Sequence, residues 1–161
     1  MDFKIETWPK TLVIGKSLTM SVAQNKTKEL WQSCVPEILH TKHRTSVDMI
    51  SLQVYPADYS FIQFNPNTTF IKWACVSVSK IQDLPPGYDF FTIPSGLYVV
   101  FSHKGLASNA GKTFGYIYGE WLPNSVYAID NRPHFEVLGR KYKNNSIDSE
   151  EDIWIPIKPR K

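Results

Sequence analysis

The stretch Pro133-His134-Phe135-Glu136-Val137-Leu138-Gly139 places one acidic residue inside a hydrophobic segment. At a period of two it is a short strand, with Phe135 and Val137 on one face and Glu136 and Leu138 on the other. Turn formers bound it on both sides. An ionised carboxylate in apolar surroundings is costly unless something pairs with it. Either a bound ligand pairs with Glu136, which is our central hypothesis, or Glu136 is a surface residue of an edge strand.

Composition limits the classes of protein to consider. The chain has 161 residues, 42% hydrophobic and 20% charged, which indicates one globular domain over residues 1–161. A net charge of +3 is too small to indicate nucleic-acid binding. The sequence has neither an apolar run of membrane-spanning length nor a signal peptide, so we expect a cytoplasmic protein. His40 and His43 lie three residues apart without a third ligand, so no metal is expected. No P-loop or dinucleotide-binding motif occurs, so no cofactor is expected.

Hydrophobic periodicity predicts strands separated by two helices. The first helix is expected to begin near Asn25 and end between His40 and Arg44, and the second to cover residues 109–121. The segment from Thr69 to Ser79 is apolar on both faces, which favours a central strand. Pro156 indicates an edge or a bulge in the last strand. The expected strands cover residues 11–22, 49–55, 69–79, 88–93, 97–103, 133–139 and 152–157.

The same order of strand, helix, strand, strand occurs twice. Residues 30–36 are similar to residues 117–123, both ending at a proline, and residues 52–55 are similar to residues 135–138. Such a repeat predicts an α+β fold of two half-domains about a pseudo-twofold axis, with one antiparallel sheet and both helices on one face. On this alignment Gln53 and Glu136 face each other across a central cleft, a common place for a ligand.

A cation site needs one buried negative charge, which Glu136 could supply, and aromatic walls. Aromatic side chains provide cation–π and stacking contacts. Taken singly, each aromatic residue is more often part of a core than of a ligand site. No second carboxylate is placed beside Glu136 by the sequence, and Glu120 falls on the solvent face of the second helix. The predicted ligand-binding residues are Glu136, Leu138, Gln53, Tyr55, Trp73, Tyr116, Trp121 and Trp31. No catalytic residue is assigned.

Four segments resemble the GyrI-like domain, the effector-binding domain of AraC-type regulators. They are Ile93-Pro94-Ser95-Gly96-Leu97-Tyr98-Val99-Val100-Phe101-Ser102-His103-Lys104-Gly105, residues 116–125, residues 132–137 and residues 152–157. The first half is similar through Val13-Ile14-Gly15 and the helix that contains Trp31. The resemblance covers nearly the whole chain and implies the duplicated fold with a ligand cleft between the halves.

The resemblance also implies a role for Glu136. In this family the glutamate of the Phe-Glu motif lies at the bottom of the cleft, and in multidrug-sensing members it meets lipophilic cations. Regulators join the domain to a helix-turn-helix, for which this chain has no room. We therefore expect a stand-alone module without direct nucleic-acid binding, a monomer or weak dimer that could have a separate protein partner.

Three functions remain open, because a fold does not choose among them. The first is binding of an amphipathic, cationic small molecule, for sensing or sequestration. The second is hydrolysis of strained cyclopropane-type compounds with Glu136 as general acid or base. The third is inhibition of a protein partner of the gyrase type. With no fixed cation apparent in the cleft, Glu136 is expected to have a raised pKa in the ligand-free protein.

Overall fold

The computed structural model describes residues 1–106, 109–143 and 146–160. Its strands are β1 (Phe3–Trp8), β2 (Thr11–Met20), β3 (Met49–Val54), β4 (Phe70–Ser77), β5 (Asp89–Ile93), β6 (Gly96–Lys104), β7 (Tyr127–Ile129), β8 (His134–Leu138) and β9 (Glu150–Pro159). Its helices are α1 (Thr27–Cys34), the short 3-10 helix η1 (Glu37–His40), α2 (Ala110–Tyr116) and a π-helical continuation of α2, η3 (Ile117–Trp121).

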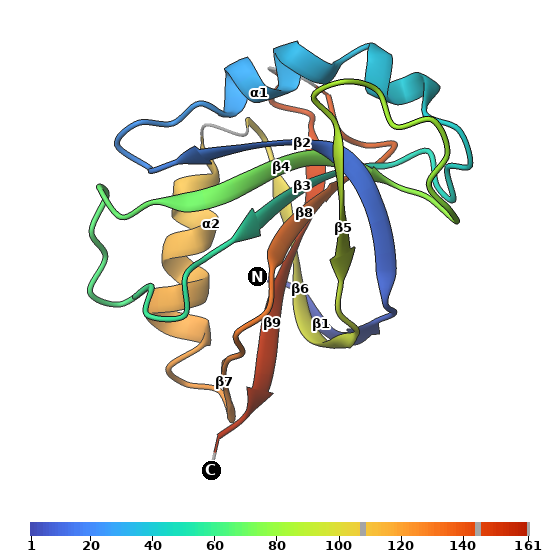
Figure 1. Cartoon of the computed structure of the whole chain (residues 1–161). Helices are drawn as coiled ribbons and strands as arrows, with labels where there is room; N and C mark the ends of the chain where they lie inside the picture. Colours follow the sequence, from blue (N-terminus) through green and yellow to red (C-terminus); the bar gives the residue numbers. More distant parts are fainter. Residues whose placement is uncertain (107–108, 144–145, 161) are drawn as a thin grey trace.

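The strands form one antiparallel sheet in the order β1-β6-β9-β8-β3-β4-β2-β5, with β7 added beside β9. This order is the same when read from either end, because β5, β2, β4 and β3 correspond to β1, β6, β9 and β8. β1 pairs with β6 and β5 pairs with β2, so each half-domain completes the sheet of the other. The chain is therefore an α+β fold of two related halves, as the internal repeat predicted (Figure 1).

The two halves meet where β3 pairs with β8. Leu52 lies opposite Phe135 in this pair. These two residues are also equivalent in the internal repeat, so the pseudo-twofold axis passes between them. Residues at equal distance on either side of this point are related by the same axis. Gln53 is thereby equivalent to Glu136, and Ser51 to His134.

Both helices cover one face of the curved sheet. Leu30 and Cys34 of α1, which lie one helical turn apart, are buried against a cluster that includes Ala74 and Val76 of β4. Ile117 is buried against Phe101 and other residues of β6 and β9. The opposite face of the sheet forms a separate core of Leu52, Phe135, Trp154 and Trp73 with residues of β2, β5 and β6. The face with the helices carries the candidate site described below.

Three local features differ from the expectations. The first helix is shorter than predicted, because α1 ends at Cys34 just before Pro36 and only a 3-10 turn follows. β1 and β7 were not predicted. Pro156 lies inside the sheet, where the partner of β9 changes from β8 to β7, so its missing N–H falls at the switch between two pairings.

Candidate ligand-binding site

The floor of the candidate site is polar and lies on β3 and β8 at the axis. Ser51 is opposite Glu136, and Gln53 is opposite His134. Directly opposed residues share a face, so all four side chains are on the face that the helices cover. Ser51, Gln53 and His134 are buried, and Glu136 is half-buried. Gln53 and Glu136 are thus diagonal neighbours across the axis.

The pKa of Glu136 lies close to neutral pH. Burial raises the pKa of Glu136 from its ordinary value of 4.5 to about 7. The charge of Lys72 and the neighbouring Gln53 side chain favour the ionised form, whereas Glu151 favours the neutral form. Burial also raises the pKa of Glu151. The raised pKa agrees with the expectation for Glu136.

The expectation that no fixed cation lies near Glu136 is wrong. Lys72 is on β4 opposite Gln53, on the same face of the sheet, and it acts electrostatically on both Glu136 and Glu151. Among the described residues, however, Glu136 has no cationic side chain within ion-pairing distance. Lys72 and Glu151 come from strands far apart in sequence, and they meet here through the order of the sheet.

Two tyrosines and a histidine stand beside Glu136. Burial raises the pKa of Tyr118 well above its ordinary value, and Tyr55 and then Glu136 raise it further. Burial, followed by the charge of Glu136, raises the pKa of Tyr55 in the same way. Burial and the charge of Arg132 lower the pKa of His134 to about 3. The Tyr118 hydroxyl is 3.3 Å from His134 Nδ1, so the two groups form a neutral hydrogen-bonded pair. Glu136 with Ser51, Gln53, Tyr55, Tyr118 and His134 is called the Glu136 site below.

Two further aromatic rings come from the segment 55–69 between β3 and β4. The ring of Phe61 stacks on Tyr118 with centroids 4.7 Å apart, and on His134 with centroids 5.0 Å apart. Tyr59 lies 4.5 Å from Tyr55 and 4.9 Å from Phe61 between ring centroids. The segment therefore closes over the aromatic part of the Glu136 site.

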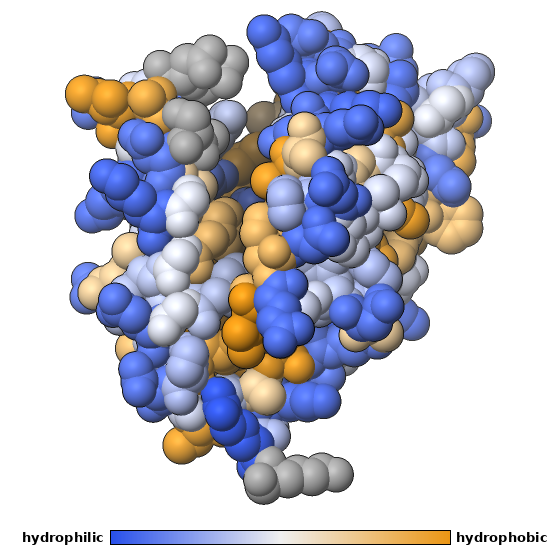
Figure 2. All heavy atoms as spheres, turned by 90° about the vertical axis from the view of Figure 1, so that its left-hand side faces the viewer, coloured by the Kyte–Doolittle hydropathy of each residue, from blue (hydrophilic) through white to orange (hydrophobic). Residues whose placement is uncertain are grey.

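A pocket of about 450 Å³ adjoins these rings. It lies between the segment 55–62, the end of the second helix and the turn before β8, and Glu136 is not among the residues that line it. Tyr55, Tyr118 and His134 belong to both the pocket wall and the Glu136 site. On the side of the molecule that carries α2, hydrophobic residues run down the middle between hydrophilic flanks (Figure 2).

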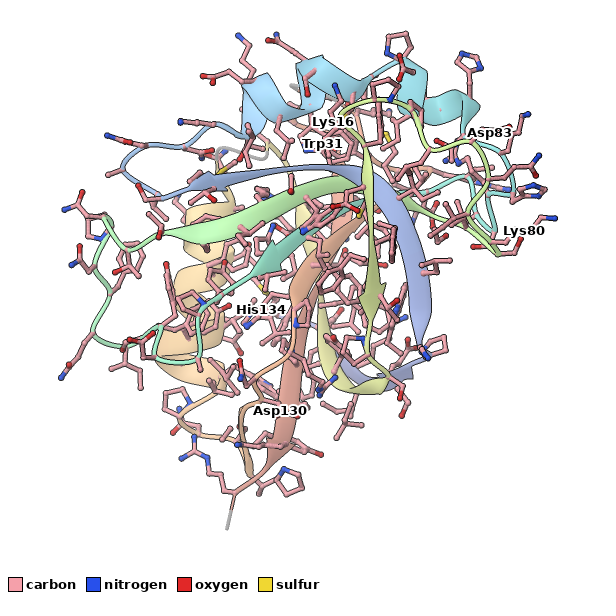
Figure 3. The ribbon with its side chains drawn as sticks, in the orientation of Figure 1. Lys16, Trp31, Lys80, Asp83, Asp130 and His134 are labelled. Carbon is pink, nitrogen blue, oxygen red and sulfur yellow. The ribbon has the colours of Figure 1, made fainter. Side chains whose placement is uncertain are left out.

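The structure brings together only part of the predicted set. Glu136, Gln53 and Tyr55 gather at the Glu136 site, and Leu138 is buried on the same face, opposite Met49. Figure 3 shows His134 at the centre of the sheet and Trp31 beneath α1. Trp31 packs against the core of the first half and remains a predicted wall residue.

Three predicted wall residues lie elsewhere. Trp73 is opposite Leu52 on β3, so it faces the other side of the sheet and packs 5.7 Å from the ring of Phe91. Tyr116 and Trp121 are on the far flank of the second helix, where both contact Phe101 and line a groove beside β1. Contrary to the prediction, the structure separates these three aromatic residues from the Glu136 site.

Tyr118 was missed although the sequence contained a signal for it. In the repeat alignment Tyr118 is equivalent to Trp31, which was assigned to the site. His134 could also have been found, since it shares the face of Glu136 two residues away. Tyr59 and Phe61 had no such signal, because segment 55–69 has no periodicity from which a facing side could be read.

Comparison with known proteins identifies the family. The model of the GyrI-like small-molecule-binding domain matches residues 1–158. The chain belongs to this family. It is 25% identical over 160 residues to the transcriptional regulator BrlR of Pseudomonas aeruginosa, a match that covers 98% of this chain and 56% of BrlR. This GyrI-like chain thus spans little more than half the length of that relative.

Solved structures share the GyrI-like fold. The structure of SAV2435 bound to tetraphenylphosphonium has a TM-score of 0.75 and 17% identity, and the match covers 98% of this chain and 94% of SAV2435. A chain of an EcmrR–DNA complex has a TM-score of 0.71 and 15% identity, and the match covers 99% of this chain and 58% of that chain. At these identities the similarity establishes the fold alone.

Proposed function

We propose that this chain binds amphipathic, lipophilic cations at the Glu136 site, with Glu136 as the counter-ion. The observation that carries the proposal is a carboxyl group on the axis whose pKa is raised to about 7 by burial and which has no ion-pair partner among the described residues. A cation about 4 Å from an ionised Glu136 would gain ~4 kcal/mol at an effective dielectric constant near 20. The cost of removing water from the carboxylate offsets part of this gain.

The aromatic neighbours complete the requirements of such a site. Tyr55 and Tyr118 stay uncharged at neutral pH, and their ring faces attract a cation without a competing charge. His134 also remains neutral and does not repel one. Because most of the affinity would come from aromatic area and a single charge, we expect broad specificity. The tetraphenylphosphonium bound to SAV2435 supports this class of ligand.

We infer that the biological role is sensing or sequestration of such compounds by a single effector-binding domain in the cytoplasm. The similarity to BrlR supports a link to transcription. The match covers 56% of BrlR and 58% of the EcmrR chain, so a large part of each of those proteins lies outside the matched region. We propose that the GyrI-like domain itself makes no direct nucleic-acid contact. No helix among the described residues is long and apolar enough to span a membrane.

A thermal-shift series tests the proposal. At a concentration of about 100 times its Kd, tetraphenylphosphonium should raise the melting temperature by roughly 5 to 10 °C, because it binds only the folded protein. Tetramethylammonium, which has the charge without the aromatic area, should leave it unchanged. Equal shifts from both cations would contradict an aromatic site.

The second candidate function is hydrolysis of a strained ring at the same site. It is favoured by a carboxyl group that titrates near pH 7 beside the Tyr118 phenol, an arrangement suited to general acid–base chemistry. Mass spectrometry after overnight incubation with a cyclopropane-containing alkylating compound separates the two functions. We expect no hydrolysed product above the buffer control. Turnover that disappears in Glu136→Gln would instead establish the enzyme.

A further inference from the structure

The ring of Phe61 stacks on two aromatic groups of the Glu136 site. It lies against Tyr118 at an interplanar angle of 20° and against His134 at 23°, both close to parallel. Its contact with Tyr55 is edge-on, with centroids 4.9 Å apart and an angle of 82°. Three of the aromatic groups that would receive a ligand in the Glu136 site are thus already in contact with a side chain of the protein.

We propose that Phe61 is an intramolecular plug of the Glu136 site, which an aromatic cation must displace in order to bind. This inference rests on the proposed function, because it concerns access to the same site. A ring cannot stack on the faces of Tyr118 and His134 while Phe61 covers them. Phe61 lines the pocket of about 450 Å³ together with Tyr118 and His134. Withdrawal of Phe61 would open that pocket toward the ring faces of Tyr118 and His134, which belong to the Glu136 site.

The segment that carries Phe61 is weakly attached elsewhere. Within the described chain, its backbone hydrogen bonds are local turns, such as Tyr59 N to Pro56 O, apart from one donated by Ala23 N to Pro66 O. The neighbouring Ile62 and Phe64 are 84% and 50% exposed, so they do not anchor the segment. The rings of Phe61 and Tyr59 contact the site, and Tyr59 also packs against the core of the first half. The part of the segment around Phe61 therefore has few attachments that its withdrawal would break.

An aromatic cation and the Phe61 side chain therefore compete for the same ring faces of the Glu136 site. When the binding-competent state is only a fraction of the population, the apparent Kd is the intrinsic Kd divided by that fraction. Phe61→Ala removes the competitor and should tighten the binding of the fluorescent cation rhodamine 6G by about tenfold, with a faster association rate. Phe64→Ala removes an exposed aromatic residue of the same segment and is the matched control, expected to bind like the wild-type chain. Weaker binding by Phe61→Ala, without faster association, would overturn the plug and make Phe61 a wall of the site.

Limited proteolysis tests the same inference without relying on affinity. With a protease of broad specificity and no dye, Phe61→Ala should be cut within residues 56–69 several-fold faster than the wild-type chain, and Phe64→Ala at the wild-type rate. Circular dichroism and the melting temperature verify that each variant is folded.

Rhodamine 6G should accelerate cleavage of the wild-type chain in this segment, since it expels Phe61. Equal cleavage of wild-type and Phe61→Ala, or protection of the segment by the dye, would overturn the plug. If rhodamine 6G binds none of the variants, the proposed function fails, and the dye-free cleavage rates still decide whether Phe61 holds the segment.

Discussion

Glu136→Gln should weaken the binding of tetraphenylphosphonium at pH 8 by at least about tenfold, or roughly 1.4 kcal/mol, while the fold is kept. The amide has nearly the same shape as the carboxylate but no charge to meet the cation. At pH 8 the Glu136 carboxyl group is ionised in most wild-type molecules, because its pKa is about 7. Calorimetric titration of the two proteins under identical conditions measures the difference.

Glu151→Gln is the matched control for this substitution. Glu151 is the second carboxyl group near Lys72, and burial also raises its pKa, but it lies further along β9, two residues from Ile153, the partner of Glu136. Its removal should change the affinity for tetraphenylphosphonium much less than the removal of Glu136. A larger loss in Glu151→Gln than in Glu136→Gln would transfer the role of counter-ion to Glu151.

Cation affinity should fall about tenfold between pH 8 and pH 6. Only the ionised form of Glu136 attracts the ligand, and with a pKa of about 7 the ionised fraction drops by about this factor over the interval. A naphthylmethyl-trimethylammonium cation carries a permanent charge, so the ligand itself does not titrate. Its neutral carbon isostere, with tert-butyl in place of trimethylammonium, should bind with the same affinity at both values of pH. Identical profiles for the two ligands would contradict the buried-carboxylate mechanism.

The Lys72→Gln variant extends the pH experiment. Because the charge of Lys72 lowers the pKa of Glu136, its removal should move the midpoint of the cation-binding profile to higher pH. The plateau affinity above that midpoint should rise, since the ligand no longer meets a like charge. An unchanged midpoint would show that Lys72 does not act on Glu136.

The same pKa gives the sign of a stability effect. The folded pKa of Glu136, about 7, is above its ordinary value of 4.5, so the folded ligand-free protein binds this proton more tightly than the unfolded chain does. Stability at this site is therefore highest below about pH 4.5 and is lost as pH rises through about 7. Glu136→Gln should remove this loss and leave the ligand-free variant at pH 8 at least as stable as the wild-type chain. A lower free energy of unfolding in the variant would contradict the cost assigned to the buried charge.

The centre of the fold could be predicted because its signals are local. The alternation in residues 133–139 fixed the face of Glu136, and the internal repeat matched Leu52 to Phe135, the pair through which the axis passes. The doubly apolar pattern of residues 69–79 identified an internal strand. In each case the information lay within one segment or in the comparison of two similar segments.

The walls of the site could not be predicted in the same way. A strand that is apolar on both faces does not indicate which of them carries Glu136, and for this reason Trp73 was predicted on the face of Glu136 although it lies on the opposite one. The second helix has aromatic residues around much of its surface, so Tyr116 and Trp121 could not be separated from Tyr118 by spacing alone. Lys72 and Glu151 reach Glu136 only through the order of strands in the sheet, which is a property of the whole chain.

The most direct test that Glu136 is the counter-ion is to count the protons released when tetraphenylphosphonium binds. Calorimetry at pH 7 in two buffers with different ionisation enthalpies gives this number. With its pKa at about 7, Glu136 is about half protonated in the ligand-free protein, and a bound cation lowers that pKa. The wild-type chain should therefore release about half a proton per bound cation, and Glu136→Gln should release none. Equal proton release by the two proteins would contradict the assignment of Glu136, even if the cation binds to both.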